Sequence, residues 1–370
     1  MGTYIKLPFY AKVSLVILGL SAFVSMLFVA QRIIVPLIYA TIMAVVLSPV
    51  VDFFVRLRMN RIVAITITII LVICLAFAIV TFLGAQAARF AETFPLLFDK
   101  FRELTAQLSH WITDTFHVDS ERINAWLLEL KAELVSAGKS AIGKTLVYTG
   151  NALIIVVLIP VYVFMILYYQ PLLLEFVHRL FRMHRKGDVN EVLVAIKKIV
   201  RSYLAGLLVE AMIIASLNSL SLFIIGIDYA LLLGVIGAIV NIIPYVGGVL
   251  GVALPCVLAL TTKPSFSYAF LVIGAYIVIQ FIDNHYVVPK IVASRVKLNA
   301  LVSVVVVLAG SALWGVPGML ISIPLTAVVK VICDHIEELK PWGYLLGDTM
   351  PAVISPFRFR RKQKVNGSGN

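Results

Sequence analysis

The stretch from residue 230 to residue 262 constrains the fold more than any other part of the chain. It contains no charged residue, and the sequence Asn-Ile-Ile-Pro-Tyr-Val-Gly-Gly at residues 241–248 interrupts it near its middle. About 20 helical residues cross the apolar core of a bilayer, so the stretch is long for one span and short for two. Pro244 has no amide hydrogen, and the Gly247-Gly248 pair lets the chain turn without a side-chain penalty. We therefore predict two half-helices that meet at a break.

The composition is that of a membrane protein. Hydrophobic residues make up 61% of the sequence and charged residues 14%, with a mean hydropathy of +1.02, whereas soluble domains carry about 25% charged residues. The net charge of +12 comes from Lys and Arg in short segments between apolar runs. That pattern orients membrane proteins, so no nucleic-acid partner is expected. We expect an all-α polytopic protein with about eight membrane segments, two of them broken helices or re-entrant hairpins.

Charge divides the chain into regions. Residues 1–88 contain three apolar runs, and residues 89–144 carry balanced charge with two amphipathic patterns, which suits an extracytoplasmic helical region. Residues 145–201 hold a fourth span and a basic cytoplasmic loop. Residues 202–333 form the expected transport core, and residues 334–370 end in a basic cytoplasmic tail. The basic segments place both termini in the cytoplasm.

A second uncharged run, residues 300–329, is interrupted by Trp-Gly-Val-Pro-Gly at residues 314–318. If both uncharged runs enter the membrane and return, residues 283–299 and the basic tail face the cytoplasm, in agreement with the positive-inside rule. We expect an inverted pair of hairpins, and kinked spanning helices packed through their glycines are the alternative. The expected bending points, including one in the fourth span, are Trp314, Gly315, Pro317, Gly318 and Pro160.

The first break is the leading candidate for a solute or ion site, because irregular backbone at membrane depth persists only inside protein or beside a wet cavity. Glu210 is the only acidic residue well inside an apolar run. A carboxylate there is costly unless it is paired, hydrated or protonated, so proton-coupled transport and a structural ion pair with Arg201 or another basic side chain near the interface are competing hypotheses. The other expected pathway residues are Asn218, Asn241, Pro244, Tyr245, Gly247, Gly248, Gln280, Asp283 and Asn284.

Motifs of catalysis are absent from the sequence. It has no phosphate-binding glycine loop, no His-Glu-x-x-His and no Cys-x-x-Cys. Its three cysteines, Cys74, Cys256 and Cys333, lie far apart in the chain, which indicates neither a disulfide framework nor a metal site. We expect no enzymatic activity, cofactor or metal, and any active transport must then use an ion gradient.

Several short motifs occur along the chain: Tyr203-x-x-Gly206, Gly226-Ile227-Asp228-Tyr229-Ala230-Leu231, Ile243-Pro244-Tyr245-Val246-Gly247, Val296-Lys297-Leu298-Asn299, residues 280–289 and residues 313–324. Together they resemble the autoinducer-2 exporter family of bacterial membrane proteins. The likeness covers nearly the whole chain and is strongest over residues 203–330. One departure is Ala300, where the family usually has proline. The resemblance implies an oligomeric inner-membrane transporter, and it links some relatives to export of the quorum-sensing furanone autoinducer-2 and others to sodium or lithium exchange for protons.

Together these observations predict a secondary transporter that uses an ion gradient to export a small polar molecule, with autoinducer-2 as one candidate. A monovalent cation/proton antiporter is the first alternative, and a non-transporting membrane scaffold is the second. The expected partners are a small polar solute, a monovalent cation or proton, the lipid bilayer and further copies of the chain.

Overall fold

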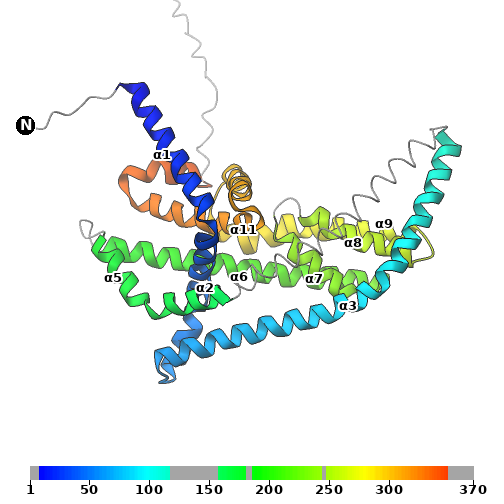
Figure 1. Cartoon of the computed structure of the whole chain (residues 1–370), viewed down its shortest axis with the longest axis horizontal. Helices are drawn as coiled ribbons and strands as arrows, with labels where there is room; N and C mark the ends of the chain where they lie inside the picture. The colour runs from blue at the N-terminus through cyan, green and yellow to red at the C-terminus, as the bar shows by residue number, and fades with distance from the viewer. Residues whose placement is uncertain (1–7, 117–156, 181–185, 244–246, 349–370) are drawn as a thin grey trace, which may run out of the picture.

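The computed structural model describes residues 8–116, 157–180, 186–243 and 247–348 (Figure 1). Across these residues the secondary structure is helical, and the one isolated β-bridge pairs Leu298 with Gly347. Six helices are long and apolar enough to cross a membrane, and a bent pair raises that number to seven. Two shorter apolar helices, α7 and α8, are also present. The expected all-α polytopic fold is confirmed.

The N-terminal part consists of long, poorly covered helices. They are α1 (Phe9–Val29), α2 (Gln31–Arg56) and α3 (Arg61–Phe116). α3 continues without interruption past the boundary predicted at residue 88, and its membrane-length part is Arg61–Phe90. The first amphipathic pattern predicted after residue 88 thus lies in the same helix as the third span, which ends close to the predicted position. The second pattern lies outside the described residues.

The fourth span is bent at Tyr169. The helical segment Val157–Tyr168 and the helix α5 (Gln170–Leu180) meet at an angle of 63°. The Arg61 guanidinium holds this bend, because its Nη2 donates to the Leu167 carbonyl and to Gln170 Oε1, each at 2.9 Å. Pro160 lies inside the first segment, and the turn before it is outside the described residues, so a kink at Pro160 stays a prediction.

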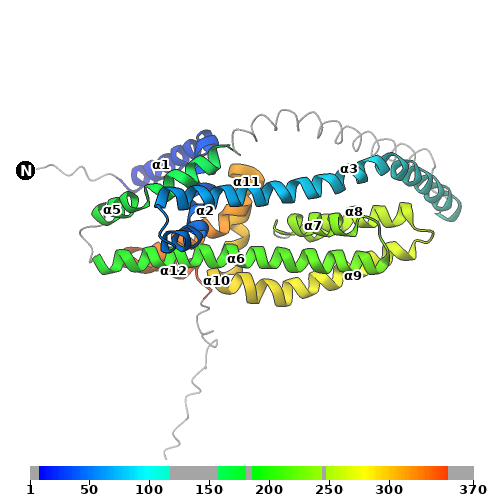
Figure 2. The ribbon, with the colours of Figure 1, turned by 90° about the horizontal axis from the view of Figure 1, so that it is seen from below.

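The C-terminal part is more tightly packed and contains α6 (Lys186–Ile225), α7 (Ala230–Asn241), α8 (Gly247–Thr262), α9 (Ser267–Ile282), the π-helix η1 (Asp283–Ala293), α10 (Ser294–Val296), α11 (Ala300–His335), η2 (Glu337–Leu339) and α12 (Lys340–Leu346). In Figure 2, α3, α6 and α9 run along the long axis beside α7 and α8. Leu222, Leu233, Leu258 and Val272 form the centre of their shared apolar core.

The helices α7 and α8 fold back on each other. A Cβ added at Gly251 would lie 3.5 Å from the Gly237 backbone, and one at Gly247 would lie 2.2 Å from the Val240 carbonyl oxygen. Glycine is therefore required at position 247, whereas the distance at Gly251 is an ordinary contact between the two helices. The predicted break at residues 241–248 is confirmed, and it is the tip of a helical hairpin instead of a kink in one helix.

The long helix α11 is also a hairpin. A Cβ at Gly310 would lie 2.6 Å from the Gly318 carbonyl oxygen, although eight residues of straight helix would separate them by about 12 Å. The chain reverses at Trp314 and at Gly315, whose φ of 64° and ψ of −146° suit only glycine. Of the four bending points predicted here, these two are the bend itself. Pro317 lies in the first turn of the second arm, where its missing amide costs little, and Gly318 provides the close contact.

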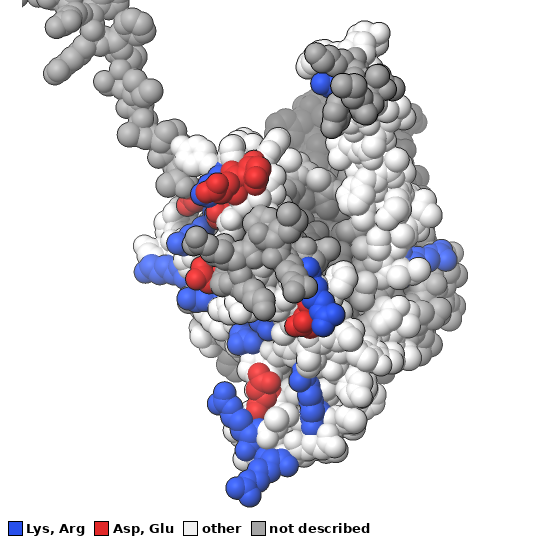
Figure 3. All heavy atoms as spheres, turned by 90° about the vertical axis from the view of Figure 1, so that its left-hand side faces the viewer, with Lys and Arg blue, Asp and Glu red and all other residues white. Residues whose placement is uncertain are grey.

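The hairpin formed by α7 and α8 determines which segments share an end of the molecule. Tyr229, just before α7, donates from its hydroxyl to the Arg89 carbonyl at 3.3 Å, so α3 and α6 reach the same end. Because the hairpin returns to that end, α9 runs back toward the start of α6 (Figure 2). The opposite end, seen in Figure 3, carries more Lys and Arg than Asp and Glu on its visible surface. This is the arrangement that the charge argument for residues 283–299 requires.

Candidate functional site

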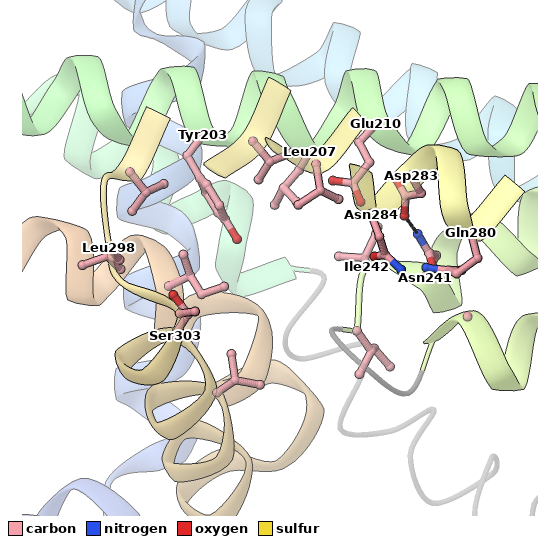
Figure 4. A pocket seen from close by; sticks show the side chains of 18 of the residues that line it. Tyr203, Leu207, Glu210, Asn241, Ile242, Gln280, Asp283, Asn284, Leu298 and Ser303 are labelled. Atoms are coloured by element: carbon pink, nitrogen blue, oxygen red, sulfur yellow. Dashed lines mark hydrogen bonds between the residues drawn. The ribbon is translucent and has the colours of Figure 1, made fainter. Parts of the chain in front are cut away.

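A cavity of about 880 Å³ lies where α6, the tip of the α7–α8 hairpin, the α9–η1 junction and the start of α11 converge (Figure 4). Its volume is within the range of roughly 300–1,000 Å³ that is usual for small-molecule sites. Most of its lining is aliphatic, which leaves a limited set of groups to recognise a solute. The polar side chains on its wall are those of Tyr203, Glu210, Asn241, Tyr276, Gln280, Asp283, Asn284, Ser303 and Asp348.

Two buried carboxylates face this cavity. Glu210 is 7% exposed and comes from α6, and Asp283 is 2% exposed and begins η1. Asn241 Nδ2 donates to Asp283 Oδ2 at 2.8 Å, whereas Asp283 Oδ1 has no hydrogen-bond partner among the described residues. In Figure 4 both carboxylates point toward the amide side chains of the hairpin tip and the α9–η1 junction.

Basic side chains do not neutralise these carboxylates within the described part of the chain, where no salt bridge includes either one. Arg201, the partner considered for Glu210, donates from Nη2 to Ser48 Oγ at 3.0 Å instead. The hypothesis of a structural ion pair between Glu210 and Arg201 is therefore wrong. Unpaired carboxylates at low dielectric strongly favour a proton, a cation or a hydrogen-bond donor from a solute.

The hairpin tip delivers both polar and backbone groups to the cavity. α7 ends at Asn241, which places that amide at the cavity wall, and the Gly247 amide turns back to the Ile243 carbonyl at 3.0 Å. A Cβ at Gly248 would lie 2.3 Å from Gln280 Oε1, so only glycine lets the Gln280 amide lie against the start of α8. Residues 244–246, with Pro244 and Tyr245, lie outside the described residues.

The structure brings most of the predicted pathway residues together. Those that line the cavity are Glu210, Asn241, Gly248, Gln280, Asp283 and Asn284. Asn218 and Gly247 line a much smaller adjoining space that also touches Asn241 and Gln280. The bending points of α11 lie elsewhere: Trp314 Nε1 donates to the Leu27 carbonyl at 3.2 Å, and the Tyr39 hydroxyl donates to the Pro317 carbonyl at 3.0 Å.

Four polar lining residues were not predicted from the sequence. Tyr203 and Tyr276 each precede a cavity carboxylate by seven residues, a spacing that puts both members of a pair on one helix face and could have revealed them. The Tyr276 hydroxyl is buried and has no hydrogen-bond partner among the described residues. Ser303 and Asp348 reach the cavity only through the tertiary fold, and no local pattern indicates either of them.

The π-helix η1 was not predicted either. It continues α9 without a gap and contains Pro289, whose missing amide hydrogen removes one regular helix hydrogen bond. π-helical turns are rare and are frequently found at functional sites. Gly206 on α6 permits the close packing of η1, because a Cβ there would lie 2.7 Å from the Ile291 carbonyl oxygen. The widened turn therefore begins at Asp283 and is held against α6 beyond the cavity.

Comparison with known proteins finds that the chain is similar to membrane transporters. The family described as "AI-2E family transporter" matches residues 14–338. "Putative transport protein YueF" of Bacillus subtilis is 24% identical, with 89% of each chain aligned. "Putative transport protein YhhT" of Escherichia coli K12 is 26% identical over 88% of this chain and 91% of that protein. The "AI-2 transport protein TqsA" of Escherichia coli K12 is 24% identical over 86% of this chain and 90% of that protein.

Proposed function

This chain belongs to the AI-2E transporter family, and we propose that it is a secondary transporter that exports a small polar molecule through the cavity at the tip of the α7–α8 hairpin. Autoinducer-2 is one candidate solute, because the relative TqsA is named an AI-2 transport protein. Membership of a transporter family does not favour a non-transporting scaffold. The energy source in this proposal is an ion gradient.

The observation that carries the proposal is the unpaired carboxylate pair at the hairpin tip. Asp283 accepts from Asn241 through one oxygen only, and Glu210 faces the same cavity without a basic partner in the described residues. Two negative charges near each other at low dielectric repel, so a proton or monovalent cation stabilises the site when it binds. In the proposed cycle, this ion binds from one side of the membrane and leaves to the other as the solute moves in the opposite direction.

The proposed location is the bacterial inner membrane, with both termini in the cytoplasm. The end of the molecule rich in Lys and Arg supports this orientation (Figure 3). We propose homo-oligomers as well, because α1 is mostly apolar and contains no buried residue. Such a helix needs lipid or another copy of the chain around it.

Purified protein in liposomes tests the function. Counterflow of autoinducer-2 or another small polar solute, accelerated by a pH gradient or a sodium gradient, is the expected result. Collapse of a pH gradient on addition of sodium, with no solute counterflow, would instead establish a cation/proton antiporter. Absence of both activities in protein that stays folded would support the scaffold and contradict transport.

Asp228→Asn provides a matched control for substitutions of the cavity carboxylates. Asp228 is exposed in the short connection between α6 and α7, so the same chemical change occurs outside the cavity. Glu210→Gln should abolish a pH dependence of transport that the control retains. If the pH dependence persists in Glu210→Gln, proton coupling through Glu210 is wrong.

A further inference from the structure

The segment after α11 folds back to the start of α11. It consists of α12 (Lys340–Leu346), Gly347 and Asp348, and we call residues 340–348 the C-terminal strap. The family match ends at residue 338, so the strap lies beyond the part of the chain shared with that family description. α12 packs against α11, and α10 leads into the start of α11.

Asn299 makes the principal polar connection to the C-terminal strap. Its Nδ2 donates to the Leu345 carbonyl at 2.7 Å and to the Gly347 carbonyl at 3.1 Å. Its backbone amide donates to the Leu346 carbonyl at 3.2 Å. The neighbouring Leu298 pairs with Gly347 in the isolated antiparallel bridge. The end of the strap is thus bound directly to the residues that open α11.

The side chain of Asn299 has a second role that can be separated from the first. Its Oδ1 accepts from the Val302 amide at 2.8 Å and so caps the first arm of α11. An Asp or a Ser retains such a capping acceptor. Neither can donate to the strap carbonyls as the Asn amide does, because an ionised Asp has no donor and the Ser side chain is shorter.

A second contact fixes the other part of the C-terminal strap. A Cβ at Gly343 would lie 2.3 Å from Asp334 Oδ1, so α12 packs directly against that carboxylate. Lys330 donates to the other oxygen of Asp334. The base of the strap therefore rests on the second arm of α11, and Asn299 holds its far end.

The far end of the C-terminal strap reaches the cavity. Asp348 lines the same cavity as Glu210 and Asp283, next to the wall that Leu298, Ala300 and Ser303 form. Asp348 and Ala300 are exposed, whereas Asp283 and Glu210 are buried. The strap therefore lies at the mouth of the cavity, and the carboxylate pair lies at its interior.

We propose that Asn299 is a positioning residue of the transport route: it holds the C-terminal strap across the mouth of the cavity, and its two side-chain donors must release the strap for a solute to enter or leave. This inference rests on the proposed function, because it takes the cavity as the solute route. The strap covers the mouth while Asn299 is bound and uncovers it when those hydrogen bonds break.

Thiol labelling of the cavity wall tests this inference without a transport assay. Val307 lines the cavity and is 5% exposed, so Val307→Cys reports on access when Cys74, Cys256 and Cys333 are replaced. Each hydrogen bond lost should shift the opening equilibrium by about fivefold. In unsealed membranes, Asn299→Asp and Asn299→Ser should each raise the rate of Val307→Cys modification by a hydrophilic maleimide by roughly tenfold or more.

A cysteine at Ser265, exposed in the turn between α8 and α9, is the control site. Its labelling rate should be equal in the protein with Asn299 and in both variants. Equal rates at Val307→Cys in all three proteins would overturn the inference, and so would a parallel rise at both sites, which indicates general loosening. Because labelling needs no transported solute, an absence of transport with the expected labelling pattern would contradict the proposed function and would support only the closure of the cavity mouth by Asn299.

Discussion

The two helical hairpins of the C-terminal part use the same backbone device for different purposes. In α7–α8 the contact is between Gly237 and Gly251, and in α11 it is between Gly310 and Gly318. The first tip presents Asn241 to Asp283 at the cavity. The tip of α11 instead binds the N-terminal helices through the Trp314 indole and the Pro317 carbonyl.

The difference teaches that a break in an apolar helix is not by itself a binding site. Both breaks reverse the chain, but only the first combines its reversal with unpaired carboxylates from neighbouring helices. The second makes one hydrogen bond to α1 and one to α2, so it connects the two halves of the chain. In the proposed function, the first hairpin therefore handles the solute and the second anchors the N-terminal helices.

Removal of the cavity charges should have the largest effect. We expect Asp283→Asn and Glu210→Gln each to lower the rate of solute counterflow by at least about tenfold, which corresponds to ~1.4 kcal/mol. The reason is that each substitution removes one of the two carboxylates that bind the coupling ion. Initial rates in proteoliposomes measure this effect, with Asp228→Asn as the unaffected control. Near-normal counterflow in both cavity variants would contradict a role of these carboxylates in transport. The α7–α8 tip would then no longer differ from the α11 tip in function.

Filling the glycine contacts should destabilise both hairpins. Gly247→Ala places a methyl group 2.2 Å from the Val240 carbonyl oxygen, and Gly310→Ala places one 2.6 Å from the Gly318 carbonyl oxygen. Overpacking of this kind costs about 1–3 kcal/mol, so thermal unfolding in detergent should occur at a lower temperature. Gly274→Ala in α9 is the control, since an added Cβ meets nothing within 4 Å there.

The same substitutions sharpen the comparison when solute affinity is measured as well. Gly247→Ala moves the tip that carries Asn241 and should weaken solute binding, whereas Gly310→Ala should leave the affinity unchanged in the protein that remains folded. Equal loss of affinity in both variants would mean that the tip of α11 also contributes to the site.

The smallest expected effect is that of substitutions at the tip of α11, which is bound to α1 and α2. Trp314→Phe removes the hydrogen bond to the Leu27 carbonyl, and Tyr39→Phe removes the one to the Pro317 carbonyl. Each should lower the free energy of unfolding by about 1 kcal/mol without a change in solute affinity. Trp342→Phe is the control because Trp342 is 61% exposed on α12. A changed affinity in Trp314→Phe or Tyr39→Phe would contradict the anchoring role.

The sequence predicted the elements of the fold better than their arrangement. Apolar runs and basic segments indicate the helices, and the Pro and Gly residues at 244–248 and 314–318 indicate where two of them break. The continuous α3 was missed because the charged residues after Ala88 suggested a boundary, yet they are compatible with a helix that continues past Phe90. The change from apolar to charged residues was interpreted as the end of the helix, although it marks only the end of its apolar part.

Two of the predicted pathway residues that line the cavity stood out from their surroundings in the sequence. Glu210 is a lone acid in an apolar run, and Asn241 adjoins the break, so both were found. Asp348 and Ser303 could not be found, because only the folding of the C-terminal strap and α11 brings them to the cavity. The contact between Asn241 and Asp283 likewise depends on how the hairpin packs against α9.

Labelling of a cysteine at Asn284 tests the central claim most directly. Asn284 is exposed and lines the cavity next to Asp283. In sealed vesicles of known orientation, a membrane-impermeant maleimide should modify Asn284→Cys from the cytoplasmic side, and the transported solute or its coupling ion should slow that modification. Modification only from the outside, or a rate that no solute or ion changes, would contradict a solute route at the tip of the α7–α8 hairpin.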